Sequence, residues 1–80
     1  MEKNISYREK HLIVKVPKEV DHCFADEIRE CVDLVLQTKD IRMLEFDFEH
    51  TEFMDSSGIG LLMGRYKLMR AVGGDVKIVH

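Results

Sequence analysis

The segment Met43-Leu-Glu-Phe-Asp-Phe-Glu49 alternates between apolar and charged side chains, so three apolar groups fall on one side and three carboxylates on the other. A period of two is typical of a β-strand that buries one face and exposes the other to water. A strand in a fully covered parallel sheet would be apolar on both faces. The pattern therefore predicts helices packed mainly against a single face of a sheet, which is a two-layer architecture.

The rest of the chain supplies two helical patterns and three further strands. Ile5 to Arg8 and Leu12 to Val16 predict a hairpin with the turn Glu9-Lys10, and Val76 begins the last strand. A first helix is expected from Asp21 to about Thr38, from the spacing of Phe24, Ile28, Val32, Val35 and Leu36. A second helix is expected from about Ser57, ended by Gly73-Gly74.

The order strand, strand, helix, strand, helix, strand predicts an α/β fold. Strands joined through a helix should be parallel neighbours, because such crossovers are right-handed. We therefore expect a mostly parallel four-stranded sheet. Eighty residues suffice for one hydrophobic core, so residues 1–80 are expected to form a single domain.

The face that the second helix buries is less sharply defined. The spacing of Ile59, Leu62, Met63, Tyr66 and Met69 predicts the buried stripe, with Arg65 and Lys67 on a solvated face. Three apolar residues, Leu61, Leu68 and Val72, lie off this stripe. They could contact a partner or be buried under further structure, and the sequence favours neither.

Charge and hydropathy exclude several classes of partner. The 15 acidic and 12 basic residues form no long run of one sign, so nucleic acid is not an expected partner. No stretch approaches the roughly 18 apolar residues of a membrane span, and the start Met-Glu-Lys-Asn lacks the apolar segment of a secretory signal. We therefore expect a cytoplasmic protein that has no membrane partner.

The stretch Asp55-Ser-Ser-Gly58 lies in a predicted strand-to-helix turn at the carboxyl end of the sheet, where open α/β sheets carry their sites. The Ser57 hydroxyl is expected to cap a free amide of Ile59 or Gly60. Ser56 would lie one residue outside the helix, which makes it the better phosphoacceptor. Taken alone, the stretch is more often simply the start of a helix.

Three glycines in the same helix reduce the weight of that simple reading. Gly58, Gly60 and Gly64 each cost about 1 kcal/mol relative to alanine in a helix interior. Something should therefore approach this helix closely. Gly60 and Gly64 are one turn apart on one face, which could admit either the sheet beneath or a partner above.

The segment from Phe53 to Lys67, Phe-Met-Asp-Ser-Ser-Gly-Ile-Gly-Leu-Leu-Met-Gly-Arg-Tyr-Lys, followed by Gly73-Gly74, resembles the signature of the STAS domain. Within that family it is most similar to the sporulation-type anti-sigma F factor antagonists. Val20-Asp21-His22 resembles the segment that precedes the first helix in that group. The resemblance spans essentially the whole chain and implies a STAS-like fold.

The resemblance implies a regulatory function without catalysis. An antagonist of this type binds an anti-sigma factor that is also a serine kinase, and thereby releases a sigma factor. The kinase phosphorylates the serine that matches Ser56, which switches binding off, and a serine phosphatase restores it. The implied partner-binding residues are Asp21, Asp55, Ser56, Ser57, Gly58 and Gly60.

The chain departs from the family in two places. Family domains usually continue past the last strand into a C-terminal helical portion, which the 80 residues lack. Pro17 also occupies a position where relatives commonly have glycine, so the loop before Asp21 is expected to differ in shape.

Other functions have weaker support. An enzyme with Ser56 as nucleophile and His22 or His50 as base would lack the Gly-x-Ser-x-Gly elbow. Gly58-x-Gly60 without a following Lys-Ser/Thr is poor support for nucleotide binding, although weak binding stays open. The four histidines match no metal-ligand spacing, so no metal or cofactor is expected. The main alternative is a sensory or transporter-associated STAS domain that is never phosphorylated.

Overall fold

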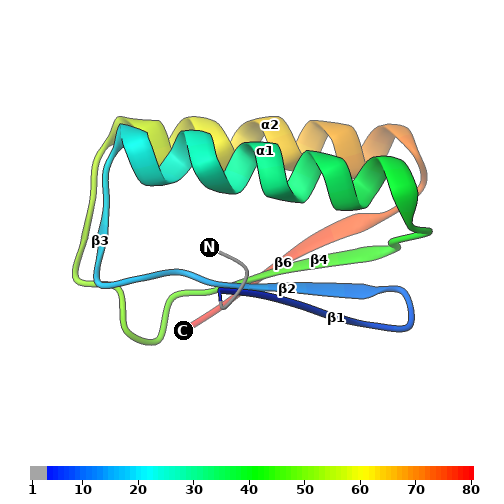
Figure 1. The fold of residues 1–80 in the computed structure, drawn as a ribbon, viewed down its shortest axis with the longest axis horizontal. Coiled ribbons are helices and arrows are strands. Elements are labelled where there is room, and N and C mark those ends of the chain that lie inside the picture. The colour runs from blue at the N-terminus through cyan, green and yellow to red at the C-terminus, as the bar shows by residue number, and fades with distance from the viewer. Residues whose placement is uncertain (1–3) are drawn as a thin grey trace.

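The computed structural model describes residues 4–80, which form two layers (Figure 1). The helices are α1 (His22–Thr38) and α2 (Ser56–Ala71). The strands are β1 (Ile5–Arg8), β2 (His11–Lys15), β3 (Glu19–Val20), β4 (Met43–Asp47), β5 (Phe53–Met54) and β6 (Asp75–Val79). Both helices lie on the same side of the main sheet, as the alternation in β4 predicts.

The main sheet has four strands in the order β1-β2-β4-β6. β1 and β2 form the expected antiparallel hairpin, and Glu9 in its turn has φ 58°. β2 pairs with β4, and β4 with β6, both parallel, so that Val14, Phe46 and Ile78 lie opposite one another. The predicted α/β fold with a mostly parallel sheet is confirmed.

The ends of the helices follow from local sequence. Asp21 caps α1, because its carboxylate accepts a hydrogen bond from the Phe24 amide at 2.9 Å. At the end of α2, Gly73 adopts φ 81°, and the amide of Gly74 donates to the Met69 carbonyl at 2.8 Å. A positive φ favours glycine, so the left-handed cap predicted at Gly73-Gly74 is present.

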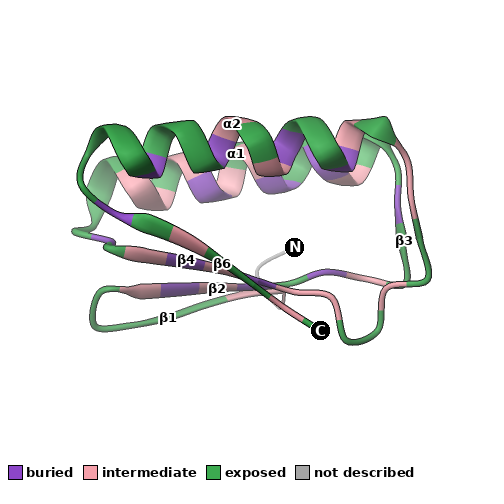
Figure 2. Cartoon of the chain, turned by 180° about the vertical axis from the view of Figure 1, so that it is seen from behind, coloured by how far each residue is buried: buried purple, intermediate pink, exposed green. Residues whose placement is uncertain are grey.

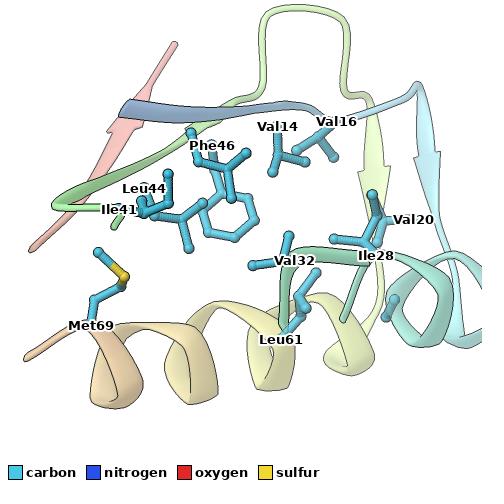
Figure 3. Packing of buried hydrophobic residues seen from close by; sticks show 12 residues of the cluster. Val14, Val16, Val20, Ile28, Val32, Ile41, Leu44, Phe46, Leu61 and Met69 are labelled. Atoms are coloured by element: carbon cyan, nitrogen blue, oxygen red, sulfur yellow. The ribbon is translucent and has the colours of Figure 1, made fainter. Parts of the chain in front are cut away.

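The core fills the space between the helix layer and the sheet (Figure 3). β2 and β4 supply the side chains that face the helices, and α1 supplies most of those that face the sheet. The buried apolar residues are Leu12, Val14, Val16, Val20, Ala25, Ile28, Val32, Ile41, Leu44, Phe46, Leu61 and Met69. The stripe predicted for α1 is therefore correct in its centre, Ile28 and Val32.

The stripe predicted for α2 is largely wrong. Met63 and Tyr66 are 54% and 45% exposed, whereas Leu61 is buried. Arg65, expected in solvent, is also buried, and its Nε lies 3.2 Å from Oδ1 of Asp33 on α1. The helix is rotated relative to the prediction because this ion pair and Leu61 face α1 and the sheet, and Figure 2 shows exposed surface along its outer side.

The buried ion pair is incompletely hydrogen-bonded. The Nε and Nη1 atoms of Arg65 and Oδ1 of Asp33 have no hydrogen-bond partner among the described residues, although Nε and Oδ1 are within ion-pair distance. The Asp33 side chain is 30% exposed, although its Oδ1 atom, which faces Arg65, is buried. The contact joins α1 to α2 chiefly as an electrostatic attraction.

On the other face of the sheet, the carboxylates of β4 are less exposed than expected. Glu45 Oε1 lies 3.0 Å from His11 Nε2, and Asp47 Oδ1 lies 2.9 Å from His80 Nδ1. The amide of Glu49 also donates to Asp47 Oδ1 at 2.9 Å. The two hydrogen bonds to Asp47 hold the pKa of its carboxyl group below the usual value. The bond from the Glu49 amide has the larger effect, and the bond with His80 has the next largest.

Candidate functional site

The two helices begin side by side at one end of the helix layer. β3 and β5 form a separate two-stranded parallel sheet, in which Val20 is opposite Met54. The Asp55 amide donates to the Val20 carbonyl at 3.2 Å. Since Asp21 and Asp55 directly follow the paired residues, the ladder brings the starts of α1 and α2 together, as Figure 1 shows.

This small sheet is absent from the sequence prediction. Its strands have two residues each, which is too short for a periodic signal, and Pro17 marked only the end of β2. The available signal was the pair of apolar residues, Val20 and Met54, that immediately precede the two capping aspartates. The ladder extends from the main sheet to the helix layer and fixes where both helices start.

The N-cap of α2 lies two residues earlier than predicted. Asp55, rather than Ser57, is the N-cap, and its Oδ1 accepts a hydrogen bond from the Ser57 amide at 2.8 Å. Three consecutive residues could each have capped the helix, and a carboxylate is among the preferred acceptors. Ser56 therefore lies within the helix, as its first residue.

Ser56 is exposed at the mouth of α2, whereas Ser57 is half-buried. The first turn of a helix carries free amide hydrogens and the positive end of the helix dipole, which favour an anion. The neighbouring carboxylate of Asp55 opposes a second negative charge. A group attached at the Ser56 hydroxyl would thus meet competing electrostatic influences.

Asp21 is exposed and caps the neighbouring helix. Its main chain follows the Val20–Met54 pair, as that of Asp55 does, so the two capping carboxylates belong to the same end of the helix layer. The structure thereby brings together Asp21 and the Asp55–Gly58 segment, residues from two distant parts of the sequence.

The glycines of α2 have different surroundings. A Cβ on Gly58 would lie 2.3 Å from Cγ of Met54 and 3.3 Å from Cγ1 of Val20, so the close approach is to the β3–β5 ladder. A Cβ on Gly60 or Gly64 would meet nothing within 4 Å. The sheet therefore does not explain Gly60 and Gly64, and Gly60 is exposed beside Ser56.

Among residues 4–80, no hydrogen bond joins Ser56 to a histidine. His22, one of the two candidate bases, has its Nε2 atom 3.6 Å from the Sγ atom of Cys23.

The structure does bring together one cluster of potential metal ligands that the sequence spacing does not show. Asp47, Glu49 and His80 each have a ligand atom within 4.8 Å of the others. Asp47 Oδ1 already accepts a hydrogen bond from the backbone amide of Glu49 and lies within hydrogen-bond distance of His80 Nδ1. In residues 4–80, neither helix has the length and apolar character that crossing a bilayer would require.

Comparison of the sequence with known proteins finds relatives that are anti-sigma factor antagonists. The chain is 36% identical over 67 residues to an anti-sigma F factor antagonist of Paenibacillus polymyxa. The matched region covers 84% of this chain and 57% of that protein. It is 30% identical over 76 residues to the anti-sigma-B factor antagonist of Bacillus subtilis, covering 94% and 67% respectively. The chain thus spans little more than half of the first of these relatives.

Solved structures give the same result. The unphosphorylated form of the anti-sigma factor antagonist SpoIIAA superposes with a TM-score of 0.85 at 27% identity, covering 92% of this chain and 68% of that one. The phosphorylated form of SpoIIAA, a Bacillus cell fate determinant, gives 0.82 at 27% identity, covering 90% and 66%. The sequence signature of the STAS domain matches residues 2–80. The chain belongs to the STAS domain family.

Proposed function

We propose that this protein is an anti-sigma factor antagonist regulated by phosphorylation of Ser56. The unmodified form binds an anti-sigma factor that is also a serine kinase, which frees a sigma factor. Phosphorylation of Ser56 prevents this binding, and a serine phosphatase reverses it. The observation that carries the proposal is that Ser56 is exposed at the first position of α2, directly after the capping Asp55 and at the end of the helix layer where Asp21 caps α1.

The binding surface in this proposal is the shared end of α1 and α2. Asp21, Asp55 and Ser56 supply its polar groups. Gly60, which is exposed and has open space around its Cα, lets a partner approach the helix backbone. Ser57 and Gly58 support the surface from below, because Ser57 is half-buried and Gly58 is packed against Met54. Residues 1–80 would form the single domain that presents this surface.

Phosphorylation should leave the fold intact. The phosphate would bring a charge of about −1.5 to −2 next to the amino end of α2, which favours an anion by about 0.3–1 kcal/mol. Two unit charges 4 Å apart in water interact by about 1 kcal/mol, so repulsion between the phosphate and the half-buried carboxylate of Asp55 is of the same order. The two influences roughly offset each other in the free protein.

The balance changes when a partner covers the site. Water then no longer screens the phosphate from the two aspartates, and an unpaired buried charge is strongly unfavourable. A tenfold loss of affinity needs only about 1.4 kcal/mol. The switch therefore acts at the interface and requires no rearrangement of the helices.

The test combines intact mass with binding. The protein is incubated with an anti-sigma F factor serine kinase and ATP, and we expect a gain of about 80 Da at Ser56, the mass of one phosphate. Ser56→Ala should stay unmodified and bind the kinase constitutively, whereas Ser56→Asp should bind poorly. Ser57→Ala is the matched control and should still be phosphorylated.

Two results would count against the proposal. Phosphate found on Ser57 and absent from Ser56 would contradict the assignment of the site. Equal affinity of the alanine and aspartate variants would contradict the electrostatic switch, and would favour an interaction domain that is never phosphorylated.

A further inference from the structure

We infer that the ion pair between Asp33 and Arg65 sets the rotation of α2 about its own axis, which makes Arg65 a positioning residue for Ser56. Arg65 is 8% exposed, and its Nε atom lies 3.2 Å from Oδ1 of Asp33 on α1. It is the one charged residue that is buried in the described part of the chain, residues 4–80. The consequence for partner binding rests on the function proposed for Ser56, whereas the rotation itself does not.

Arg65 and Ser56 lie on opposite faces of α2. They are nine residues apart, which is about 2.5 turns at about 3.6 residues per turn. Leu61 and Met69, one turn before and one turn after Arg65, are buried with it. Because the face that carries Arg65 is directed at α1 and the sheet, Ser56 is directed to solvent, on the outer side of the helix that Figure 2 shows as exposed.

Apolar side chains alone leave a second rotation open to α2. Ile59, Leu62, Met63 and Tyr66 form an apolar stripe whose centre is about 110° from Arg65, at about 100° per residue. Burial of that stripe would turn Arg65 away from Asp33. It would also bring Ser56 from the position opposite the buried face to within about 70° of its centre, at the margin of the buried surface.

The ion pair discriminates between the two rotations. In the second rotation Asp33 Oδ1, which is buried, would lose its cation, and an unpaired buried charge is strongly unfavourable. A buried ion pair adds little net stability compared with apolar groups of the same size, because both charges lose their water. Its best-attested effect is to fix how two elements align, which is the effect inferred for α1 and α2.

The β3–β5 ladder does not fix the rotation by itself. It holds the start of α2 through the hydrogen bond from the Asp55 amide to the Val20 carbonyl at 3.2 Å. Gly58 permits the close approach to Met54 but has no side chain with which to hold it. The ladder therefore locates the start of the helix, and the Arg65 contact, about 14 Å along the axis from the first residue, decides which way the first turn faces.

Under the proposed function, the rotation of α2 decides how many molecules can bind a partner. The proposed binding surface needs Ser56 and Gly60 on the outer face of α2. The apparent affinity falls in proportion to the fraction of molecules that have the binding-competent arrangement. Loss of the ion pair should therefore weaken binding in a chain that is still folded.

The rotation is tested without a partner, by the rate at which iodoacetamide modifies an introduced thiol. In a chain with Cys23→Ser and Cys31→Ser, Leu61→Cys reports on the buried face and Met63→Cys on the exposed face. Arg65→Met places an apolar side chain that suits either rotation. It should raise the rate at position 61 by about fivefold or more and lower the rate at position 63, in proportion to the population that turns.

Affinity for an anti-sigma F factor serine kinase is measured on chains without introduced cysteines. Arg65→Met should weaken binding about tenfold, which corresponds to about one molecule in ten in the competent rotation. Arg65→Lys keeps the charge and should bind almost as the unaltered chain does. Exchange of the pair, Asp33→Arg with Arg65→Asp, should recover most of the affinity. Arg70→Met is the matched control, because it removes an exposed arginine of the same helix and should leave the affinity unchanged.

Circular dichroism should show that all variants are folded. The inference is overturned if Arg65→Met changes neither thiol rate, or raises both, since a rise in both indicates a loosened helix. It is also overturned if the rates shift as expected while the affinity stays unchanged, or if the exchanged pair recovers neither. Failure of the unaltered chain to bind the kinase contradicts the proposed function instead, and the two thiol rates still decide the rotation.

Discussion

Replacement of the α2 glycines by alanine should change stability in opposite directions, according to what lies next to each glycine. A Cβ on Gly64 would meet nothing within 4 Å. Gly64→Ala should therefore stabilise the protein by about 1 kcal/mol, the difference in helix propensity. For a domain of this size, 1 kcal/mol corresponds to a rise in Tm of about 4–8 °C.

Gly58→Ala gains the same propensity but introduces a clash. Its Cβ would lie 2.3 Å from Cγ and 2.4 Å from Sδ of Met54, so the methionine side chain must move as a whole. Val20 Cγ1, at 3.3 Å, limits the space on the other side. Overpacking of this kind costs about 1–3 kcal/mol, so the net effect should be a loss of up to about 2 kcal/mol.

A double-mutant cycle separates the clash from the propensity. In a Met54→Ala background the obstructing atoms are gone, and Gly58→Ala should become stabilising, like Gly64→Ala. The free energies of unfolding are measured with urea for the four proteins of the cycle and for Gly64→Ala. If Gly58→Ala stabilises the protein to the same extent with Met54 present as in the Met54→Ala background, the close approach of α2 to the β3–β5 ladder is refuted as the reason for this glycine.

Three further perturbations test other parts of the structure. Asp33→Ala leaves Arg65 buried without its ion-pair partner and should lower the free energy of unfolding, measured with urea, by about 1–3 kcal/mol. Arg65→Met should lower it less, and the reverse order would contradict a destabilising unpaired charge. Because the pKa of Asp47 is lowered in the folded state, its carboxylate contributes stability above about pH 4, and this stability is lost as the pH falls through the folded-state pKa. Asp47→Asn should therefore reduce the loss of unfolding free energy at acid pH, and an unchanged acid dependence would contradict this. Gly73→Ala should lower the stability by about 1–2 kcal/mol because φ of this residue is 81°, and Gly73→Asn should lower it less. Thermal unfolding compares the two variants with the unaltered protein, and equal Tm values for all three would contradict the cap.

The sequence predicted the elements whose burial is one-sided. In β4, every second residue faces the helices, and in α1 the apolar residues fall on one stripe, so periodicity alone identifies both the element and its buried face. Leu44, Phe46, Ile28 and Val32 are buried as that reasoning requires. The hairpin and the cap at Gly73 also follow from local preferences, because a turn is decided by a few adjacent residues.

The orientation of α2 could not be predicted in this way, because its apolar residues occur on every side of the helix. Leu61, on the buried side, and Met63, on the exposed side, have similar hydropathy, so the pattern offers no unique stripe. What distinguishes the buried side is Arg65, whose charge would normally indicate solvent. Its burial depends on Asp33 of α1, which is 32 positions earlier in the chain and can be located only once the two helices are packed.

The same limitation applies to the site. Residue type correctly indicated a helix start in Asp55-Ser-Ser, but three good capping residues in succession leave the N-cap undetermined from sequence, and the choice of Asp55 moved Ser56 into the helix. The juxtaposition of the two helix starts depends on a ladder of two-residue strands that has no signature of its own. The residues proposed to bind a partner were therefore identifiable from the motif, whereas the geometry that places Asp21 at the same end of the helix layer as Ser56 is a tertiary property of the β3–β5 pair.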